Sequence, residues 1–441
     1  MKNLFSIVFV LFIALGYSQE RIPQKIYKKA NAINGLIKEN KIEKAVAYTL
    51  DVHQEGKALW VNQMHSNYSQ QISRDTKSTH LYFSELQKLE IQEIKEFSFP
   101  IYLWSQSFAL NELNSEDILE LYPKALQNAK WEARTETYVL LALKNLASKN
   151  LITNHELVTG IQACIDQLEP QIITADFLTD HSESKLNTWK KYVLTYSYYL
   201  LSQVDANNTE KNFQKAFRYS PNSIDEANSN YFFDNLLLTG STDKLNIPGK
   251  YYAFLVENEG PDDEKRKALE KAVFATPTNY NLNLLKNYVE NSNSEIDFKS
   301  YWQGVFNKEA TPLSKAMETE LTTLLGEDLK GKWWFVDFWG TWCSPCIEDL
   351  PIVEKLYINA SQTSTNNFKV QTFSYLSRKL DKFMSKNEYS FPVKEIEENS
   401  VQQLNIGGFP TKLLISPEGN FIKLNLSKRW DQYVKNYVLL N

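Results

Sequence analysis

Apolar residues recur every three or four positions along most of the chain, from about residue 20 to about residue 308. Two clear examples of this spacing are Leu186, Trp189, Val193, Tyr196 and Leu200, and Leu140, Leu143 and Leu146. Such spacing places apolar side chains on one face of an α-helix. Turn-forming clusters at 240–243 and 247–249 separate the helical stretches, and runs typical of strands are few. The pattern therefore predicts an all-α domain over residues 19–310.

The arrangement of these helices has two possible forms. The segment 215–222 resembles the segment 271–278, because each closes a helical stretch with a proline turn. Such a turn is similar to the one that ends the second helix of a tetratricopeptide-type pair. The offset between the two segments, however, differs from the roughly 34-residue repeat of that family. A tetratricopeptide-like solenoid and an irregular helical bundle both fit the sequence.

The pattern changes beyond a loop or linker at 310–313, where strands and helices begin to alternate. The nearly continuous apolar run Trp333–Trp339 predicts a buried strand, and a helix follows through Leu350, Val353 and Tyr357. Further strands are predicted at 368–375, 413–416 and 421–426, and further helices at 377–387 and 430–440. The turn residues at 417–420 indicate a hairpin. Residues 311–441 are therefore predicted to form an α/β domain around a central mixed sheet.

The first residues have the order of a secretory signal peptide. Lys2 precedes an apolar stretch from Leu4 to Leu15, and the small residue Ser18 precedes a polar turn. The alternative is an uncleaved membrane anchor, but the apolar run is shorter than the roughly 20 residues that span a bilayer. We expect a signal peptide over 1–18 and a mature protein that is exported and soluble.

Composition narrows the class of protein further. The chain is 43% hydrophobic and 23% charged, with a net charge of −5 and no long basic block. Nucleic acid is therefore excluded as an expected partner. The chain also carries 24 Tyr, 24 Phe and 10 Trp, which favour an ordered core over disorder.

The chain has three cysteines, too few for a disulfide framework in an exported protein of this size. Cys164 lies in an apolar helical context and is expected to be a buried free thiol. Cys343 and Cys346 form the one close pair, which we interpret as a redox-active dithiol. A structural disulfide is the alternative.

Two other uses of this cysteine spacing do not fit. Haem attachment requires a histidine directly after the second cysteine, where Ile347 stands. A closed zinc site requires two further ligands. The histidines all lie far away, in the helical region, at His53, His65, His80, His155 and His181. No metal and no cofactor are expected apart from the disulfide itself.

Residues from about 320 to 441 resemble the thioredoxin fold, and more narrowly the exported TlpA/ResA type. The resemblance rests on several motifs together: Asp328-Leu329-Lys330-Gly331-Lys332, Phe338-Trp339-Gly340-Thr341-Trp342-Cys343-Ser344-Pro345-Cys346, Pro351, Gly408-Phe409-Pro410-Thr411, and Ser416-Pro417-Glu418-Gly419. It covers about the last quarter of the chain. The resemblance implies a thiol–disulfide oxidoreductase of the bacterial periplasm.

The resemblance and the residues together suggest roles for the cysteines and Asp337. Cys343 is expected at a helix N-terminus, whose N–H groups and dipole favour the thiolate, and so to be the more acidic and exposed cysteine. Cys346, one turn later, would resolve the mixed disulfide. Asp337 matches the buried acid that accepts the proton of the resolving cysteine. The alternative for Asp337 is a structural aspartate paired with a lysine.

The resemblance also suggests the substrate groove. Pro410 matches a proline preceded by a cis peptide bond, which would set the Phe409 backbone beside Cys343 to pair with an extended substrate. Phe409 is bulkier than expected there, and Trp342 is expected to shield the site. Asp349 stands where the TlpA/ResA type usually has Glu, and is either an active-site acid or a helix-surface aspartate.

These observations lead to two hypotheses. The first is an exported oxidoreductase that reduces protein disulfides through Trp342-Cys343-Ser344-Pro345-Cys346 and is itself reduced by a membrane electron donor. Its helical domain would bind a partner protein, and a chain starting near Leu313 would fold alone. The second is a helical partner-binding protein with an accessory thioredoxin-like module.

Overall fold

The computed structural model describes residues 23–56, 76–108, 115–128, 133–172, 188–221, 229–241, 245–292, 295–362, 367–424 and 429–439. The expected signal peptide at 1–18 lies outside the described residues. The chain divides into two compact units. Within the described ranges, the helical unit runs from 23 to 221 and from 230 to 245, and the sheet unit runs from 246 to 439.

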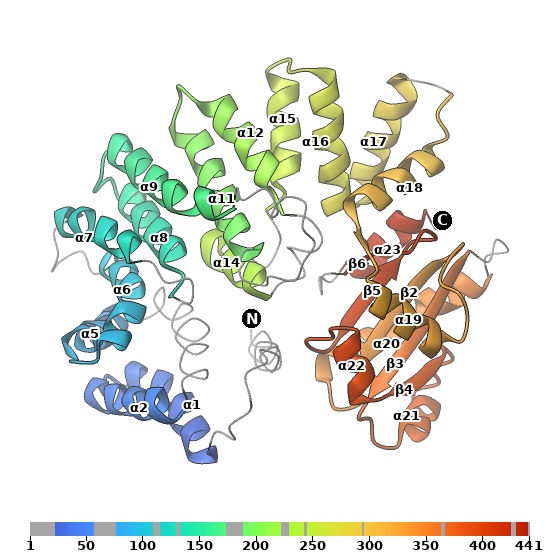
Figure 1. Cartoon of the computed structure of the whole chain (residues 1–441), viewed down its shortest axis with the longest axis horizontal. Coiled ribbons are helices and arrows are strands. Elements are labelled where there is room, and N and C mark those ends of the chain that lie inside the picture. Colours follow the sequence, from blue (N-terminus) through green and yellow to red (C-terminus); the bar gives the residue numbers. More distant parts are fainter. Residues whose placement is uncertain are drawn as a thin grey trace. The chain divides into compact units, whose positions relative to one another are not determined.

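Helices make up the described part of the helical unit (Figure 1). They are α1 Gln24–Lys38, α2 Ile42–Glu55, α5 Thr76–Lys88, α6 Gln92–Gln106, α7 Ser115–Gln127, α8 Thr135–Ser148, α9 Asn154–Ile172, α11 Thr188–Val204, α12 Thr209–Tyr219 and α14 Ser229–Thr239. The strongest contacts join helices that follow one another, such as α1 with α2, α5 with α6, and α11 with α12. Contacts between near neighbours are typical of stacked helix pairs. The predicted all-α region is confirmed.

The apolar faces predicted from the spacing are buried in this unit. Leu140, Leu143 and Leu146 of α8 all lie in the core, as does Val193 of α11, whereas Leu186 lies outside the described residues. Cys164 of α9 is a buried free thiol, as expected. Its burial raises the pKa of the thiol well above the ordinary value.

The sheet unit begins with helices α15 Ile247–Glu257, α16 Asp262–Ala275, α17 Asn279–Ser292 and α18 Phe298–Glu309. Alternating elements follow: β1 Thr311–Pro312, α19 Lys315–Leu325, β2 Trp333–Trp339, α20 Ser344–Gln362, β3 Phe368–Tyr375, α21 Leu380–Lys386, β4 Val393–Ile396, α22 Glu398–Gln403, β5 Thr411–Ile415, β6 Asn420–Lys423 and α23 Trp430–Val438. The described strands form one sheet in the order β1-β6-β5-β2-β3-β4. β2 is parallel to β3, β3 to β4, and the other neighbours are antiparallel. The predicted mixed sheet is confirmed.

Some predicted bounds differ from the structure. The expected linker at 310–313 contains β1, because Thr311 and Pro312 pair with the edge of β6. The helix predicted from 377 starts at Leu380, since Lys379 adopts a left-handed backbone conformation with a φ of 56°. Residues 425 and 426 of the strand predicted at 421–426 lie outside the described residues.

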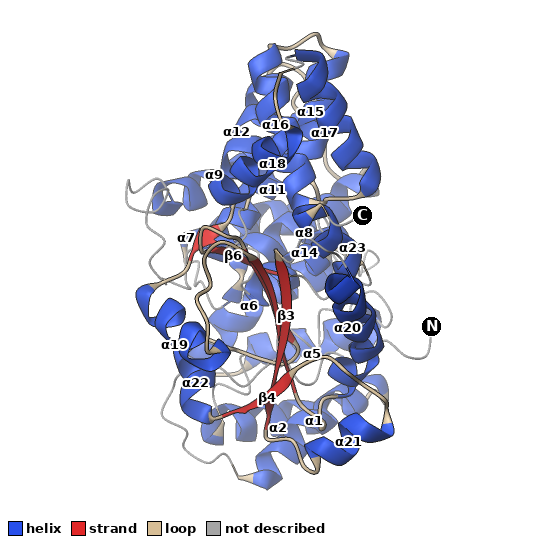
Figure 2. Ribbon diagram, turned by 90° about the vertical axis from the view of Figure 1, so that its right-hand side faces the viewer, coloured by secondary structure: helices blue, strands red, loops and turns tan. Residues whose placement is uncertain are grey.

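Helices cover both faces of the sheet, which explains the continuous apolar run of β2. Figure 2 shows α19 and α22 on one side of the strands and α20 on the other. Trp333, Phe335 and Trp339 pack into the core on the α20 and α23 side. Val336 and Phe338 pack on the α19 and α22 side. Side chains alternate between faces along a strand, so a strand covered on both sides needs apolar residues at nearly every position.

The α18 helix shares a core with the sheet. Phe306 packs edge-on against Trp333, with ring centroids 4.7 Å apart, and Trp302 stacks on Tyr437 of α23 at 6.2 Å. The Trp302 indole N–H donates to the carbonyl oxygen of Asn436 at 3.1 Å. The compact units accordingly divide between residues 245 and 246, whereas the sequence predicted a division at 310.

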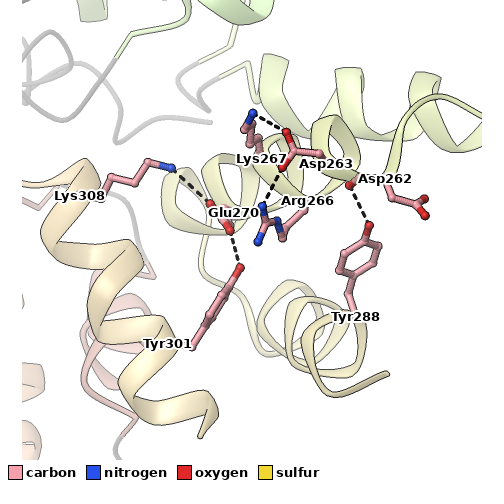
Figure 3. Close-up of polar contacts among 8 residues, drawn as sticks. All are labelled: Asp262, Asp263, Arg266, Lys267, Glu270, Tyr288, Tyr301 and Lys308. Carbon is pink, nitrogen blue, oxygen red and sulfur yellow. Dashed lines mark hydrogen bonds and ion pairs between the residues drawn. The ribbon is translucent and has the colours of Figure 1, made fainter. Parts of the chain in front are cut away.

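Polar contacts hold α16, α17 and α18 together (Figure 3). Glu270 of α16 accepts hydrogen bonds from the Tyr301 hydroxyl and from Lys308 Nζ of α18, the latter at 3.4 Å. The Tyr288 hydroxyl of α17 donates to the backbone carbonyl of Asp262 on α16 at 3.0 Å. These helices form one block that extends the sheet unit.

Every helix in the described part of the chain is too short or too polar to cross a bilayer.

Candidate active site

The cysteine pair lies where β2 ends and α20 begins. Cys343 and Cys346 are joined by a disulfide, with Cα atoms 5.3 Å apart. The backbone N–H of Cys346 points to Cys343 Sγ at 3.3 Å. Because α20 starts at Ser344, Cys343 precedes the first helical turn, whose unpaired N–H groups favour a thiolate at this position.

Both sulfur-bearing side chains are buried in this oxidised form. Cys343 is 2% exposed and Cys346 is 1% exposed. The expected greater exposure of Cys343 is therefore barely visible in the oxidised form and stays a prediction for the dithiol. Packing buries both side chains, since both cysteines belong to the apolar cluster that also contains Trp339 and Leu350.

Aromatic side chains surround the start of α20. The Trp342 indole is 48% exposed, and its N–H donates to the carbonyl oxygen of Tyr375 at 2.8 Å. Phe409 packs edge-on against Trp342 at 5.4 Å and stacks on the Tyr375 ring at 5.3 Å. Gly340 is required beneath the indole, because a Cβ there would lie 2.5 Å from Trp342 Nε1 and 2.9 Å from the Tyr375 carbonyl oxygen.

The loop before β5 completes this side of the site. The Phe409–Pro410 peptide bond is cis, as the sequence predicted. The Thr411 hydroxyl donates to the Gly408 carbonyl at 2.7 Å and braces the loop. Beyond Tyr375, Leu376 is 69% exposed and has a φ of 50°, a conformation that side chains with a Cβ seldom adopt. Trp342, directly before Cys343, and Leu376, directly after Tyr375, thus leave apolar surface exposed.

Asp337 lies buried on the same face of the sheet as α20, since Asp337 alternates with Phe335 and Trp339 along β2. Its carboxylate Oδ1 is 3.2 Å from Nζ of Lys412, the residue directly opposite on β5. Burial raises the pKa of the Asp337 carboxyl above its ordinary value, and the Lys412 ammonium partly opposes that rise. Asp337 is thus paired with a lysine, as the alternative expected, and its role as proton acceptor stays a prediction.

Asp349 of α20 joins the same cluster. Its Oδ2 is 3.0 Å from Lys412 Nζ, and its side chain is 23% exposed. The Lys412 ammonium is fully buried and lies over the Trp430 ring, 5.1 Å from the centroid. Asp349 is therefore an ion-paired, partly buried side chain and not a solvated helix-surface aspartate.

The sequence and structure of the chain were compared with those of known proteins. No family model matches the chain. The thiol–disulfide oxidoreductase ResA of Oceanobacillus iheyensis is 29% identical over 129 residues, which cover 29% of this chain and 67% of that protein. The ResA of Bacillus cereus is 27% identical over 146 residues, covering 31% of this chain and 83% of that protein. A solved thiol:disulfide interchange protein of the thioredoxin family from Chlorobium tepidum aligns with a TM-score of 0.23 and 22% identity, covering 25% of this chain and 80% of its own.

The C-terminal part of the chain is similar to thiol–disulfide oxidoreductases of the ResA type, and its paired cysteines support a thioredoxin-like oxidoreductase. The alignments cover less than a third of the chain, so most of it lies outside the ResA-like part. This remainder includes the helical unit, which the compared relatives do not explain.

The ResA-like part brings most of the sequence-predicted site residues together. Trp342 contacts Phe409, and Asp337 and Asp349 meet through Lys412. Their catalytic and substrate-binding roles, like that of Pro410, stay predictions. Among the described residues, no three His, Cys, Asp or Glu side chains gather into a group that could hold a metal.

Sequence reasoning missed Lys412, Tyr375 and Leu376. Lys412 could have been identified from the sequence, because it is a charged residue at the start of the apolar strand residues Leu413–Ile415. Asp337 was identified for the same reason, as a charged residue within an apolar strand. Leu376 carries no such signal, because its exposure depends on the loop conformation after β3.

Proposed function

We propose that this protein is an exported thiol–disulfide oxidoreductase that reduces protein disulfides through Cys343 and Cys346. One observation carries the proposal: the cysteine pair precedes the first turn of α20, in a part of the chain that aligns with ResA proteins. The signal-peptide pattern at 1–18 supports export, and the absence of a basic block disfavours nucleic acid.

In this reaction the Cys343 thiolate attacks one sulfur of a substrate disulfide and releases the other as a thiolate. Cys346 then loses its proton and attacks Cys343 Sγ, which releases the second substrate thiolate and forms the Cys343–Cys346 disulfide. Two electrons pass from the protein dithiol to the substrate, and the substrate thiolates take up two protons. Asp337 accepts the proton of Cys346, because it is a buried carboxylate on the same face of the sheet as α20.

The substrate groove lies along Trp342, Phe409 and Pro410. An extended substrate segment pairs with the backbone beside Pro410, as a strand added to a loop edge. The exposed apolar surfaces of Trp342 and Leu376 favour substrates with an apolar residue near the disulfide. A membrane electron donor returns the disulfide to the dithiol.

The helical unit selects the partner or the location of the reaction. It offers no cysteine pair of its own, since Cys164 is a buried free thiol. The alternative of a binding protein with an accessory module has no specific support, because the cysteine pair, Asp337 and the cis bond before Pro410 are all present.

Reduction of insulin disulfides by dithiothreitol tests the proposal. Cys343→Ser should abolish catalysis, and Cys346→Ser should accumulate mixed disulfides with substrate. Cys164→Ser is the matched control and should keep full activity. Full activity in Cys343→Ser would overturn the proposal.

The direction of electron flow needs a separate measurement. Equilibration of the full chain with glutathione gives the reduction potential of the pair. A value near about −270 mV supports a reductant, whereas one near about −120 mV supports an oxidant.

A further inference from the structure

Lys412 is a fully buried cation shared between two carboxylates on different elements. Asp337 of β2 lies 3.2 Å from Lys412 Nζ, and Asp349 of α20 lies 3.0 Å from it. The cross-strand register fixes the first contact, since Asp337 and Lys412 are direct partners between β2 and β5. One positive and two negative charges thus meet in one cluster, under the Trp430 ring.

The second carboxylate matters because of what protonation does to a buried ion pair. A buried ammonium whose only partner becomes neutral is left as an uncompensated charge, which is strongly unfavourable. In the proposed reaction, Asp337 becomes neutral when it takes the proton of Cys346. If Asp337 were the only carboxylate beside Lys412, each resolving step would leave the ammonium unpaired.

Asp349 removes that obstacle. It contacts the same Nζ, and its 23% exposure lets water stabilise its negative charge. When Asp337 carries the proton, Lys412 and Asp349 form a neutral pair. When Asp337 is ionised, Lys412 is shared between both carboxylates.

We propose that Lys412 is a positioning residue for Asp337, and that Asp349 holds the Lys412 ammonium during the step in which Asp337 carries the proton. The proposal rests on the proposed function. The Cys346 thiol gives its proton to the Asp337 carboxylate while its sulfur attacks Cys343 Sγ. Asp337 then returns the proton to the departing substrate thiolate or to water. Lys412 and Asp349 exchange no proton.

The remaining groups around Asp337 are consistent with this assignment. Lys412 comes from β5, and Asp349 comes from α20, which also carries the cysteine pair. The partner of Asp337 on β3 is Thr372, which carries no charge. Asp349 raises the pKa of the Asp337 carboxyl and Lys412 lowers it, so the two residues adjust the same carboxyl in opposite directions.

The test measures the resolving step as a function of pH in the full-length chain. Reduced protein is mixed with oxidised glutathione, and the reaction is quenched with acid. The mixed disulfide between protein and glutathione is then quantified by mass spectrometry. The decay of this species gives the rate at which Cys346 attacks. This rate is measured from pH 4 to pH 9, and its midpoint, the pH at which it reaches half its maximum, reports the pKa of the carboxyl that accepts the proton.

Three variants give distinct expectations. Lys412→Met should raise the midpoint by about one to three pH units, because a cation next to Asp337 is lost. Asp349→Asn should lower the midpoint and slow the step at neutral pH. Lys412 then pairs with Asp337 alone, which stabilises the ionised Asp337 carboxylate and makes it a weaker base. Glu348→Gln is the matched control: it removes an exposed carboxylate one residue away and should leave the midpoint unchanged.

Two results would overturn the inference. One is a midpoint in Asp349→Asn equal to that in Glu348→Gln, a comparison that stands even if Lys412→Met does not fold. The other is a wild-type pH profile that Asp337→Asn leaves unaltered. The proposed function fails separately, through retained activity in Cys343→Ser.

Discussion

Removal of α15 to α18 together with β1 should prevent the rest of the sheet unit from folding, although these elements carry none of the redox residues. Two chains make the comparison, one spanning Asn246–Asn441 and one spanning Leu313–Asn441. From sequence alone, the shorter chain is expected to fold by itself. In the structure, Trp302 and Phe306 of α18 are almost completely buried against Tyr437 and Trp333.

The magnitude follows from the side chains that the shorter chain lacks. Truncation of one buried Phe or Trp to Ala costs about 3–5 kcal/mol, so losing Trp302 and Phe306 together costs about 6–10 kcal/mol. A whole domain is stable by only about 5–15 kcal/mol. The shorter chain also lacks β1, which leaves β6 as an unpaired edge strand prone to association.

Urea unfolding followed by tryptophan fluorescence and circular dichroism measures the outcome. The longer chain should unfold cooperatively, and the shorter one should lack a cooperative transition or aggregate. Within the longer chain, Trp302→Ala should lose about 3–5 kcal/mol, whereas Tyr280→Ala, at an exposed aromatic of α17, should lose little. A shorter chain as stable as the longer one would refute the reasoning, and residue 310 would then be the true domain boundary.

Three further predictions concern the site and the lone thiol. Gly340→Ala should lose about 1–3 kcal/mol in thermal unfolding, because its Cβ would displace the Trp342 indole from the Tyr375 carbonyl; unchanged stability would show that the contact is dispensable. Cys164 should react with iodoacetamide much more slowly in the native protein than in urea, since burial raises its pKa and blocks access; equal rates would contradict this. Asp337 has a folded-state pKa above its ordinary 3.8, so its contribution to stability is present below that pH and lost as the pH rises through the raised value. The unfolding free energy of Asp337→Asn relative to wild type should therefore increase from pH 4 to pH 8, and a constant difference would rule out a raised pKa.

Elements with strong local signals could be predicted from sequence. The strand at Trp333–Trp339 was predicted with its observed bounds, because a strand covered on both faces leaves a continuous apolar run. The cis bond before Pro410 was predicted from the motif that surrounds it. Asp337 stood out because a carboxylate within an apolar run is costly unless it is paired or protonated.

Features that depend on contacts between distant elements could not be predicted in the same way. The Lys412 contacts require the β2–β5 register and the placement of α20, neither of which the local pattern contains. The short strand β4 at Val393–Ile396 has an exposed, charged middle and no apolar alternation. The burial of Cys343 depends on packing around α20, which the helix-terminus argument does not address.

The α23 helix explains why the compact sheet unit starts at residue 246 and not at the predicted boundary of 310. It also connects the helices before residue 310 to the active site. Trp430 and Tyr437 lie two helical turns apart on one face of α23. Tyr437 stacks on Trp302 of α18, while Trp430 lies over the Lys412 ammonium. One helix thus contacts both the helical block and the buried charge cluster. Because α18 fixes the position of α23, and α23 covers Lys412, the helices before residue 310 support the proposed proton acceptor and are more than an attachment to a self-sufficient redox module.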